Sequence, residues 1–228
     1  MVLTVRKFEA QGFRSLQAIA YPMSTLDVFV GPNGVGKTNL YRALELLQSA
    51  ARNTLAHDLA RQGGLASALW AGKRRRSDPV RLRLAVDLAE PASARRAGPV
   101  YRYEVEVGFP PRAASAAFQA EPQIKTEAVS LVGGSRTGRL IDRRGSAVMG
   151  RTEGGRPEEI DIDLLDSETV LGRLEDPSPG PSDWRALAWR SRTFRSASSS
   201  RRSCRTGPCA ISPWPARCSP TACHRSSP

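Results

Sequence analysis

The sequence lacks any long hydrophobic run, and its N-terminus lacks an apolar signal core. No stretch approaches the roughly 18 consecutive apolar residues that indicate a membrane-spanning helix. The first ten residues, MVLTVRKFEA, alternate between polar and apolar types, unlike an export signal. We therefore expect no membrane segment and a cytoplasmic location.

Lysine is scarce although the chain is basic. Of 34 basic residues only four are lysines, and the net charge is +12. Seven arginines and no acidic residue fall within residues 191–228, so the rest of the chain is only mildly basic. Charge makes DNA a candidate partner, but this uneven distribution weakens the inference. A basic cluster at residues 73–76 fits either a solvated turn or a contact with a phosphate backbone.

The C-terminal tail differs in composition from the rest. Residues 191–228 contain no Leu and no Val, and cannot bury enough apolar surface to offset the entropy of ordering, so we expect disorder there. Two interpretations stay open, a genuine basic arm and an out-of-frame translation of a GC-rich gene. We accordingly divide the chain into an N-terminal lobe, residues 1–190, and a tail, residues 191–228.

The cysteines all lie in that tail and do not form a recognisable metal motif. With His224 they follow the spacing C-x4-C-x8-C-x4-C-H, which lacks the close C-x2-C pairs of common zinc sites. A cytoplasmic chain also gives little reason to expect disulfides. The four residues are Cys204, Cys209, Cys218 and Cys223.

Apolar periodicity predicts an α/β fold. The run LDVFV, residues 26–30, is typical of a strand buried on both faces of a parallel sheet. Spacings of three and four predict a helix from Thr38 to about Ala60, and a second short helix at residues 65–72. Alternating segments predict an antiparallel sheet with one wet face, a hairpin at residues 140–150 turning at Arg144–Gly145, and an exposed acidic strand at residues 158–168. The segments of this sheet are residues 80–88, 100–109 and 124–132, and two further extended segments are expected at residues 3–8 and 15–21.

The strongest motif is GPNGVGKT, residues 31–38. It matches the phosphate-binding pattern G-x-x-x-x-G-K-[ST] at every fixed position, between an apolar strand and an amphipathic helix. Glycines let backbone N–H groups approach phosphate oxygens, and the helix N-terminus favours their negative charge. Lys37 is predicted to pair with the β- and γ-phosphates of ATP, and the Thr38 hydroxyl to bind Mg²⁺. The predicted nucleotide-binding residues in this segment are Gly31, Pro32, Asn33, Gly34, Val35, Gly36, Lys37, Thr38 and Asn39.

Two segments together resemble a known family. FRSL, residues 13–16, followed by LDVFVGPNGVGKTNLYRALELL, residues 26–47, is similar to ABC-type ATPases related to RecF and the SMC proteins, and especially to predicted bacterial AAA-family ATPases. The resemblance is strong over about residues 1–70. It implies a P-loop core of ABC-ATPase type with an added antiparallel sheet, ATP-driven head-to-head dimerisation of the full-length form, and a nucleotide contact from Arg14. For the glutamine that senses magnesium it leaves Gln62, Gln119 and Gln123 as alternatives.

Two parts of that family pattern are missing. The chain has neither the serine-glycine signature segment nor an apolar strand ending in Asp-Glu, which would complete the magnesium shell and activate water. We therefore predict the N-terminal part of an ATPase, with an incomplete C-terminal lobe, that binds ATP and lacks its own hydrolytic residues. The alternative prediction is a non-catalytic nucleotide- and nucleic-acid-binding module with a basic C-terminal arm.

Overall fold

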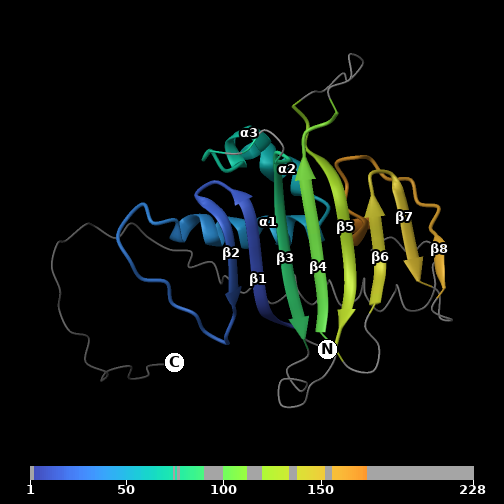
Figure 1. Ribbon diagram of the computed structural model, residues 1–228, viewed down its shortest axis with the longest axis horizontal. Coiled ribbons are helices and arrows are strands. Elements are labelled where there is room, and N and C mark those ends of the chain that lie inside the picture. Colours follow the sequence, from blue (N-terminus) through green and yellow to red (C-terminus); the bar gives the residue numbers. More distant parts are fainter. Residues whose placement is uncertain are drawn as a thin grey trace, which may run out of the picture.

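A single antiparallel sheet organises the molecule. The computed structural model describes residues 3–73, 75, 78–89, 100–111, 120–133, 138–151 and 156–173. Eight strands pair in the order β2-β1-β3-β4-β5-β6-β7-β8, and every neighbouring pair is antiparallel (Figure 1). Their bounds are β1 Thr4–Phe13, β2 Leu16–Pro22, β3 Arg81–Ala89, β4 Val100–Gly108, β5 Gln123–Val132, β6 Gly138–Arg144, β7 Ala147–Arg151 and β8 Pro157–Glu159.

The alternating segments of the sequence form this sheet, as predicted. In β3, Leu82, Leu84 and Val86 are buried, whereas Arg81 and Arg83 are exposed on the other face. A period of two places alternate side chains on opposite faces of a strand. The predicted antiparallel sheet with one wet face is therefore confirmed.

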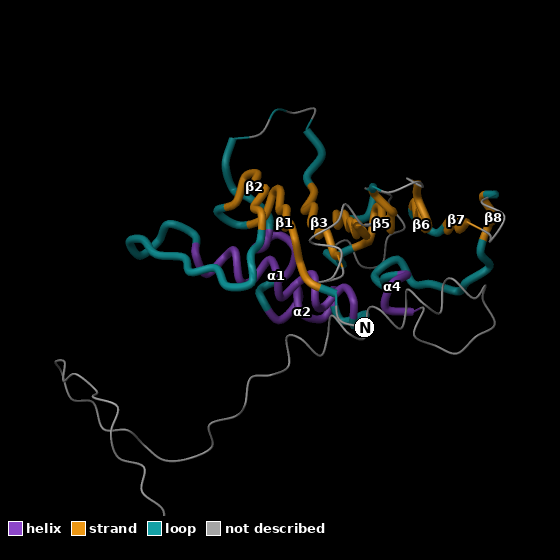
Figure 2. The backbone as a smooth tube through the Cα atoms, turned by 90° about the horizontal axis from the view of Figure 1, so that it is seen from below, coloured by secondary structure: helices purple, strands orange, loops and turns teal. Residues whose placement is uncertain are grey.

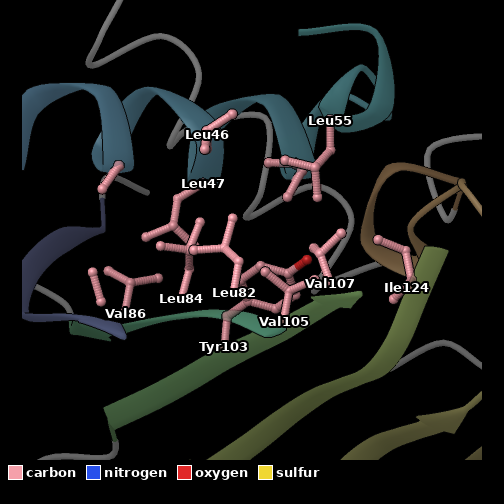
Figure 3. Close-up of a cluster of buried hydrophobic side chains, with 14 of the residues drawn as sticks. Leu46, Leu47, Leu55, Leu82, Leu84, Val86, Tyr103, Val105, Val107 and Ile124 are labelled. Atoms are coloured by element: carbon pink, nitrogen blue, oxygen red, sulfur yellow. The ribbon is translucent and has the colours of Figure 1, made fainter. Parts of the chain in front are cut away.

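Helices cover one face of the sheet. They are α1 Lys37–Ala51, α2 Leu55–Arg61, α3 Gly64–Ala68 and α4 Val170–Arg173. Figure 2 shows α1, α2 and α4 on the same side of the strands. Leu47 of α1 and Leu55 of α2 point toward apolar side chains of the central strands (Figure 3), and Leu46 is buried in the same cluster. This layer is the hydrophobic core, and the loop preceding α1 is anchored at its edge.

The predicted single helix over residues 38–60 is wrong in its length, because the structure divides it. Asn53 takes a positive φ of 58°, which a regular helix does not allow. The Asn53 side-chain oxygen accepts a hydrogen bond from the Thr169 backbone N–H at 2.9 Å. A contact with a distant segment thus accompanies the end of α1 at Ala51. The predicted short helix at residues 65–72 is present as α3, over a shorter range.

The predicted buried strand at residues 26–30 is not present. These residues lie in the loop between β2 and α1, which projects beyond the end of α1 (Figure 2). Leu26, Val28 and Val30 are 81%, 74% and 86% exposed. Burial on both faces requires flanking strands, and the described residues place no parallel neighbour beside this segment.

The C-terminal part of the described chain returns beneath the sheet. The predicted hairpin is present as β6 and β7, with Gly145 at its turn. The predicted acidic strand is confirmed only at its start, as β8. Beyond it Ile160 and Ile162 are partly buried against the core, so this part of the segment is not an exposed strand.

A buried polar cluster fixes this returning segment. The Glu127 carboxylate accepts hydrogen bonds from the backbone N–H groups of Val170 at 2.7 Å and Leu171 at 3.0 Å, and from the Tyr103 hydroxyl at 3.0 Å. Arg143 donates to the carbonyls of Leu165 and Glu168. Buried polar groups are stable when they are hydrogen-bonded in this way, so the cluster holds α4 against β5 and β6.

The exposed face of the sheet carries a ladder of ion pairs. Arg102 on β4 bonds Glu9 at 2.5 Å, Asp87 at 2.9 Å and Glu104 at 3.1 Å. Beside it Arg81 pairs with Glu106, and Arg83 with Glu104, each at 2.8 Å. Arg81, Arg83 and Arg102 are thereby each paired with carboxylates of the sheet itself.

Several sequence predictions concern residues outside the described part. The four cysteines, the disorder of the tail and its two interpretations all fall on residues 191–228, and two members of the basic cluster, Arg74 and Arg76, are also outside it. Among the described helices, none has the length and apolar character needed to cross a membrane.

Candidate functional site

The glycine-rich loop lies at the N-terminus of the longest helix. It links the exposed segment 26–30 to α1, which begins at Lys37 (Figure 1). Gly36 stands at the N-cap with φ 97°, and Gly34 has φ 89°, both in the region that favours glycine. The two glycines therefore allow a backbone turn that other residues would strain.

The start of α1 is suited to a negative charge. Gly36 has no side chain with which to cap the helix, and the first turn contains no acidic residue. The first N–H groups of a helix lack partners within the helix, and the helix dipole adds partial positive charge there. A phosphate group at this point would receive hydrogen bonds that the protein itself does not satisfy with a side chain.

Lys37 folds back over the loop. Its Nζ donates hydrogen bonds to the carbonyl oxygens of Gly31 at 2.5 Å and Pro32 at 2.7 Å. These bonds hold the ammonium group within the loop. The predicted cation therefore lies among the predicted backbone ligands.

The remaining predicted residues of the loop are accessible. Asn33, Gly34, Val35 and Thr38 are exposed, and Val35 is 59% exposed. Thr38 occupies the first turn of α1, next to Lys37. A hydroxyl there can ligate a divalent cation only together with oxygen atoms from another source, because the described residues hold no cluster of three His, Cys, Asp or Glu side chains suited to a metal.

Arg14 lies close to this helix and is under conformational strain. It follows Phe13 in the turn between β1 and β2 and has a positive φ of 47°, which is rare for a residue with a side chain. Its backbone N–H bonds the Ala68 carbonyl at 2.8 Å. Burial, and secondarily the charge of Arg42 on α1, lower the pKa of Arg14. Two guanidinium groups thus contribute positive potential beside α1.

The guanidinium of Arg14 is held by Gln62. One nitrogen lies 3.3 Å from the Gln62 side-chain oxygen and 3.4 Å from its carbonyl oxygen, while the buried Nε has no hydrogen-bond partner. Of the three glutamine alternatives, Gln62 therefore bonds Arg14. Gln123 donates to Asp166 at 2.9 Å on the far part of the sheet, and Gln119 is outside the described residues.

One residue of the site was not predicted. Ser15 follows Arg14 in the turn and accepts a hydrogen bond from the Asn39 side-chain amide at 2.8 Å. Asn39 was predicted to bind nucleotide, and in the structure its side-chain amide donates a hydrogen bond to the Ser15 hydroxyl oxygen. Ser15 belongs to the FRSL segment, residues 13–16, in which the sequence resemblance implied a nucleotide contact only for Arg14.

An aromatic cluster connects the exposed segment to the body. The ring of Phe29 lies 5.1 Å from that of Tyr21 on β2 and 6.1 Å from that of Tyr41 on α1, between centroids. Such separations are typical of favourable aromatic pairs. Phe29 therefore contacts both β2 and α1, and Asp27 of the same segment accepts a hydrogen bond from the Tyr21 hydroxyl at 3.4 Å.

One family model matches the part of the chain that contains the glycine-rich loop. Residues 28–121 match the family model described as "AAA domain, putative AbiEii toxin, Type IV TA system". No curated protein matches the chain. A solved structure from work on the structural biochemistry of ATP-driven dimerization and DNA stimulated activation of SMC ATPases is 19% identical, covers 59% of this chain and 71% of that chain, and has a TM-score of 0.33. The predicted resemblance to AAA-family ATPases is confirmed over residues 28–121 by this family model.

Proposed function

We propose that the chain binds ATP with Mg²⁺ through the loop at residues 31–38. The observation that carries the proposal is the position of Lys37. Its ammonium group lies among the loop carbonyls directly at an α-helix N-terminus that no acidic side chain neutralises. Phosphate binding at such a terminus uses both free N–H groups and the helix dipole.

Arg14 is the further cation of this proposed site. Its proximity to Arg42 places two guanidinium groups near α1, and its positive φ is a strain of the kind that clusters at functional sites. A polyphosphate would relieve the repulsion between these charges. In this proposal Thr38 supplies the one protein ligand to Mg²⁺, with phosphate oxygens and water as the others.

We further propose that this chain has negligible ATPase turnover. Hydrolysis requires a group that positions water and groups that stabilise the transition state, in addition to phosphate binding. The sequence supplies no apolar strand ending in Asp-Glu.

The nucleic-acid alternative gains no support from the described sheet face. Arg81, Arg83 and Arg102 are paired with carboxylates, which reduces the positive charge available to a phosphate backbone. Phosphate contacts dominate DNA affinity. A DNA-binding function would therefore depend on the basic residues of the tail.

The test is equilibrium binding of MgATP to the full chain and to matched variants. Lys37→Ala should weaken binding about 10- to 100-fold, since a hydrogen bond to a charged group contributes about 1.5–3 kcal/mol. Lys73→Ala removes the same charge from an exposed loop and should leave the affinity unchanged. Equal affinities of the two variants would exclude the loop as the binding site.

Turnover is measured in the same preparations. We expect phosphate release from the wild-type chain at the background level of Lys37→Ala. Turnover comparable to that of a complete ATPase, lost in Lys37→Ala, would overturn the proposed lack of hydrolysis while preserving the proposed site.

A further inference from the structure

We propose that Ser15 is an additional phosphate-binding residue, and that Asn39 is the positioning residue that orients its hydroxyl. This inference rests on the proposed nucleotide-binding function and extends the site beyond the loop to the turn between β1 and β2. It also changes the role of Asn39 from ligand to orienting group.

The first observation is how closely the turn approaches the loop. A Cβ atom added at Gly36 would lie 2.7 Å from the Ser15 Oγ and 3.8 Å from the Ser15 Cβ. Gly36 is the N-cap of α1, where a phosphate would meet the first N–H groups. The Ser15 hydroxyl therefore lies beside the N-cap residue of α1, next to the N–H groups that a phosphate would meet.

The second observation is the direction of the hydrogen bond. The Asn39 amide nitrogen donates to the Ser15 Oγ at 2.8 Å, so the serine oxygen is the acceptor. A serine hydroxyl also carries one hydrogen that it can donate. Within the described part of the chain no acceptor takes that hydrogen, and Ser15 is exposed, so a ligand can reach it.

The third observation concerns the backbone that carries Ser15. Arg14, immediately before it, has a φ of 47° and is fixed by the bond from its N–H to the Ala68 carbonyl and by the bonds to Gln62. The turn is thus held on one side by Gln62, which follows α2, and by Ala68 of α3, and on the other side by Asn39. Groups positioned in advance lose little entropy on binding a ligand, which favours affinity.

The role of Asn39 follows from these contacts. An amide that donates to the Ser15 oxygen leaves the hydroxyl hydrogen free for a phosphate oxygen. A carboxylate at position 39 would instead accept that hydrogen and would add a negative charge at the helix start, where it competes with the anion. Asn39→Asp should therefore be more harmful than Asn39→Ala.

The experiment measures MgATP affinity in a double-mutant cycle. Ser15→Ala should weaken binding about tenfold, which corresponds to one hydrogen bond to phosphate. Asn39→Ala should weaken binding in the wild-type background and have no further effect in Ser15→Ala, because it acts through the hydroxyl. Ser15→Thr, which keeps the hydroxyl, should retain affinity within about threefold, a rescue that steric support alone would not require.

A second ligand separates phosphate contact from general support of the fold. Inorganic tripolyphosphate with Mg²⁺ has no base or ribose, and Ser15→Ala should lower its affinity by the same factor as that of MgATP. The thermal midpoint of Ser15→Ala without ligand should stay within about 2 °C of the wild type, because Ser15 is exposed.

The outcomes distinguish this inference from the proposed function. If the wild-type chain binds MgATP and Lys37→Ala weakens it, but Ser15→Ala does not, only the role of Ser15 is refuted. Independent, additive effects of Ser15→Ala and Asn39→Ala would refute the orienting role of Asn39. If the wild-type chain binds no MgATP at all, the proposed function and this inference both fail.

Discussion

Glu127 and Arg143 face each other across the β5–β6 pair, and both side chains are buried, with 3.9 Å between the nearest charged atoms. Each also bonds the segment that leads into α4. Two strands and a returning segment thus meet at one charged pair. The stability of this part of the molecule should depend on both partners.

Glu127→Ala should lower the free energy of unfolding by about 3–5 kcal/mol. It removes the acceptor for the Val170 and Leu171 N–H groups and leaves Arg143 buried without its partner charge. Arg144 follows Arg143 on β6, and its side chain is 75% exposed. Arg144→Ala should therefore lower the free energy of unfolding by less than about 1 kcal/mol. Urea denaturation compares the two, and equal costs would contradict the role assigned to Glu127.

The contribution of Glu9 should depend on pH. Its hydrogen bond with Arg102, and then that with Lys7, lower the pKa of Glu9 to about 2, from an ordinary value of 4.5. A lowered pKa in the folded state stabilises the fold above the unfolded value, and this stabilisation is lost as the pH falls toward 2. The free-energy difference between the wild type and Glu9→Gln should therefore be largest above about pH 5 and shrink toward pH 2.

Glu158→Gln provides the control for this measurement. Glu158 lies exposed on β8 and takes no part in the ion pairs around Arg102. The difference in the free energy of unfolding between Glu158→Gln and the wild type should show no comparable change with pH. A difference for Glu9→Gln that stays constant between pH 2 and 6 would argue against the assigned ion pair.

Val28 should be tolerant to substitution in spite of its apolar neighbours. Because it is 74% exposed, Val28→Thr should change the free energy of unfolding by less than about 0.5 kcal/mol. Leu84→Ala, in the core, should cost about 2–5 kcal/mol. A cost above about 1 kcal/mol for Val28→Thr would show that the segment is buried after all, as its sequence pattern predicts.

DNA affinity provides a test of the alternative function. Because arginines of the sheet face are neutralised by carboxylates, any DNA binding by the full chain should be steeply salt-dependent and should disappear when the residues after Thr193 are removed. Fluorescence anisotropy with a labelled duplex at several salt concentrations measures this. Affinity that survives the deletion would locate a nucleic-acid surface in the remaining residues.

The sheet could be predicted from the sequence because its pattern is local. The alternation of apolar and polar residues in segments such as residues 80–88 predicts which side chains face the core. The start of α1 could be predicted as well, since Gly36 and Lys37 belong to a motif that ends a loop and begins a helix. These features need no information from distant residues.

The remaining features depend on contacts that a local pattern does not contain. The end of α1 coincides with the bond between Asn53 and Thr169, more than a hundred residues away. The exposure of residues 26–30 depends on whether neighbouring strands exist, and the apolar run is the same in either case. In the site, the role of Ser15 could not be predicted, because it depends on contacts with Asn39 and Gly36, which are more than twenty residues away in the sequence.

The strand order has a consequence for how the chain folds. Every neighbouring pair of strands is consecutive along the chain except β1 and β3. Between these two lie β2, the glycine-rich loop, α1, α2 and α3. Consecutive antiparallel pairs require only short-range closure, whereas joining β1 to β3 closes a loop of more than sixty residues. The step that brings these two strands together should therefore limit the folding rate. At that step the helices that carry the candidate site would dock on the sheet.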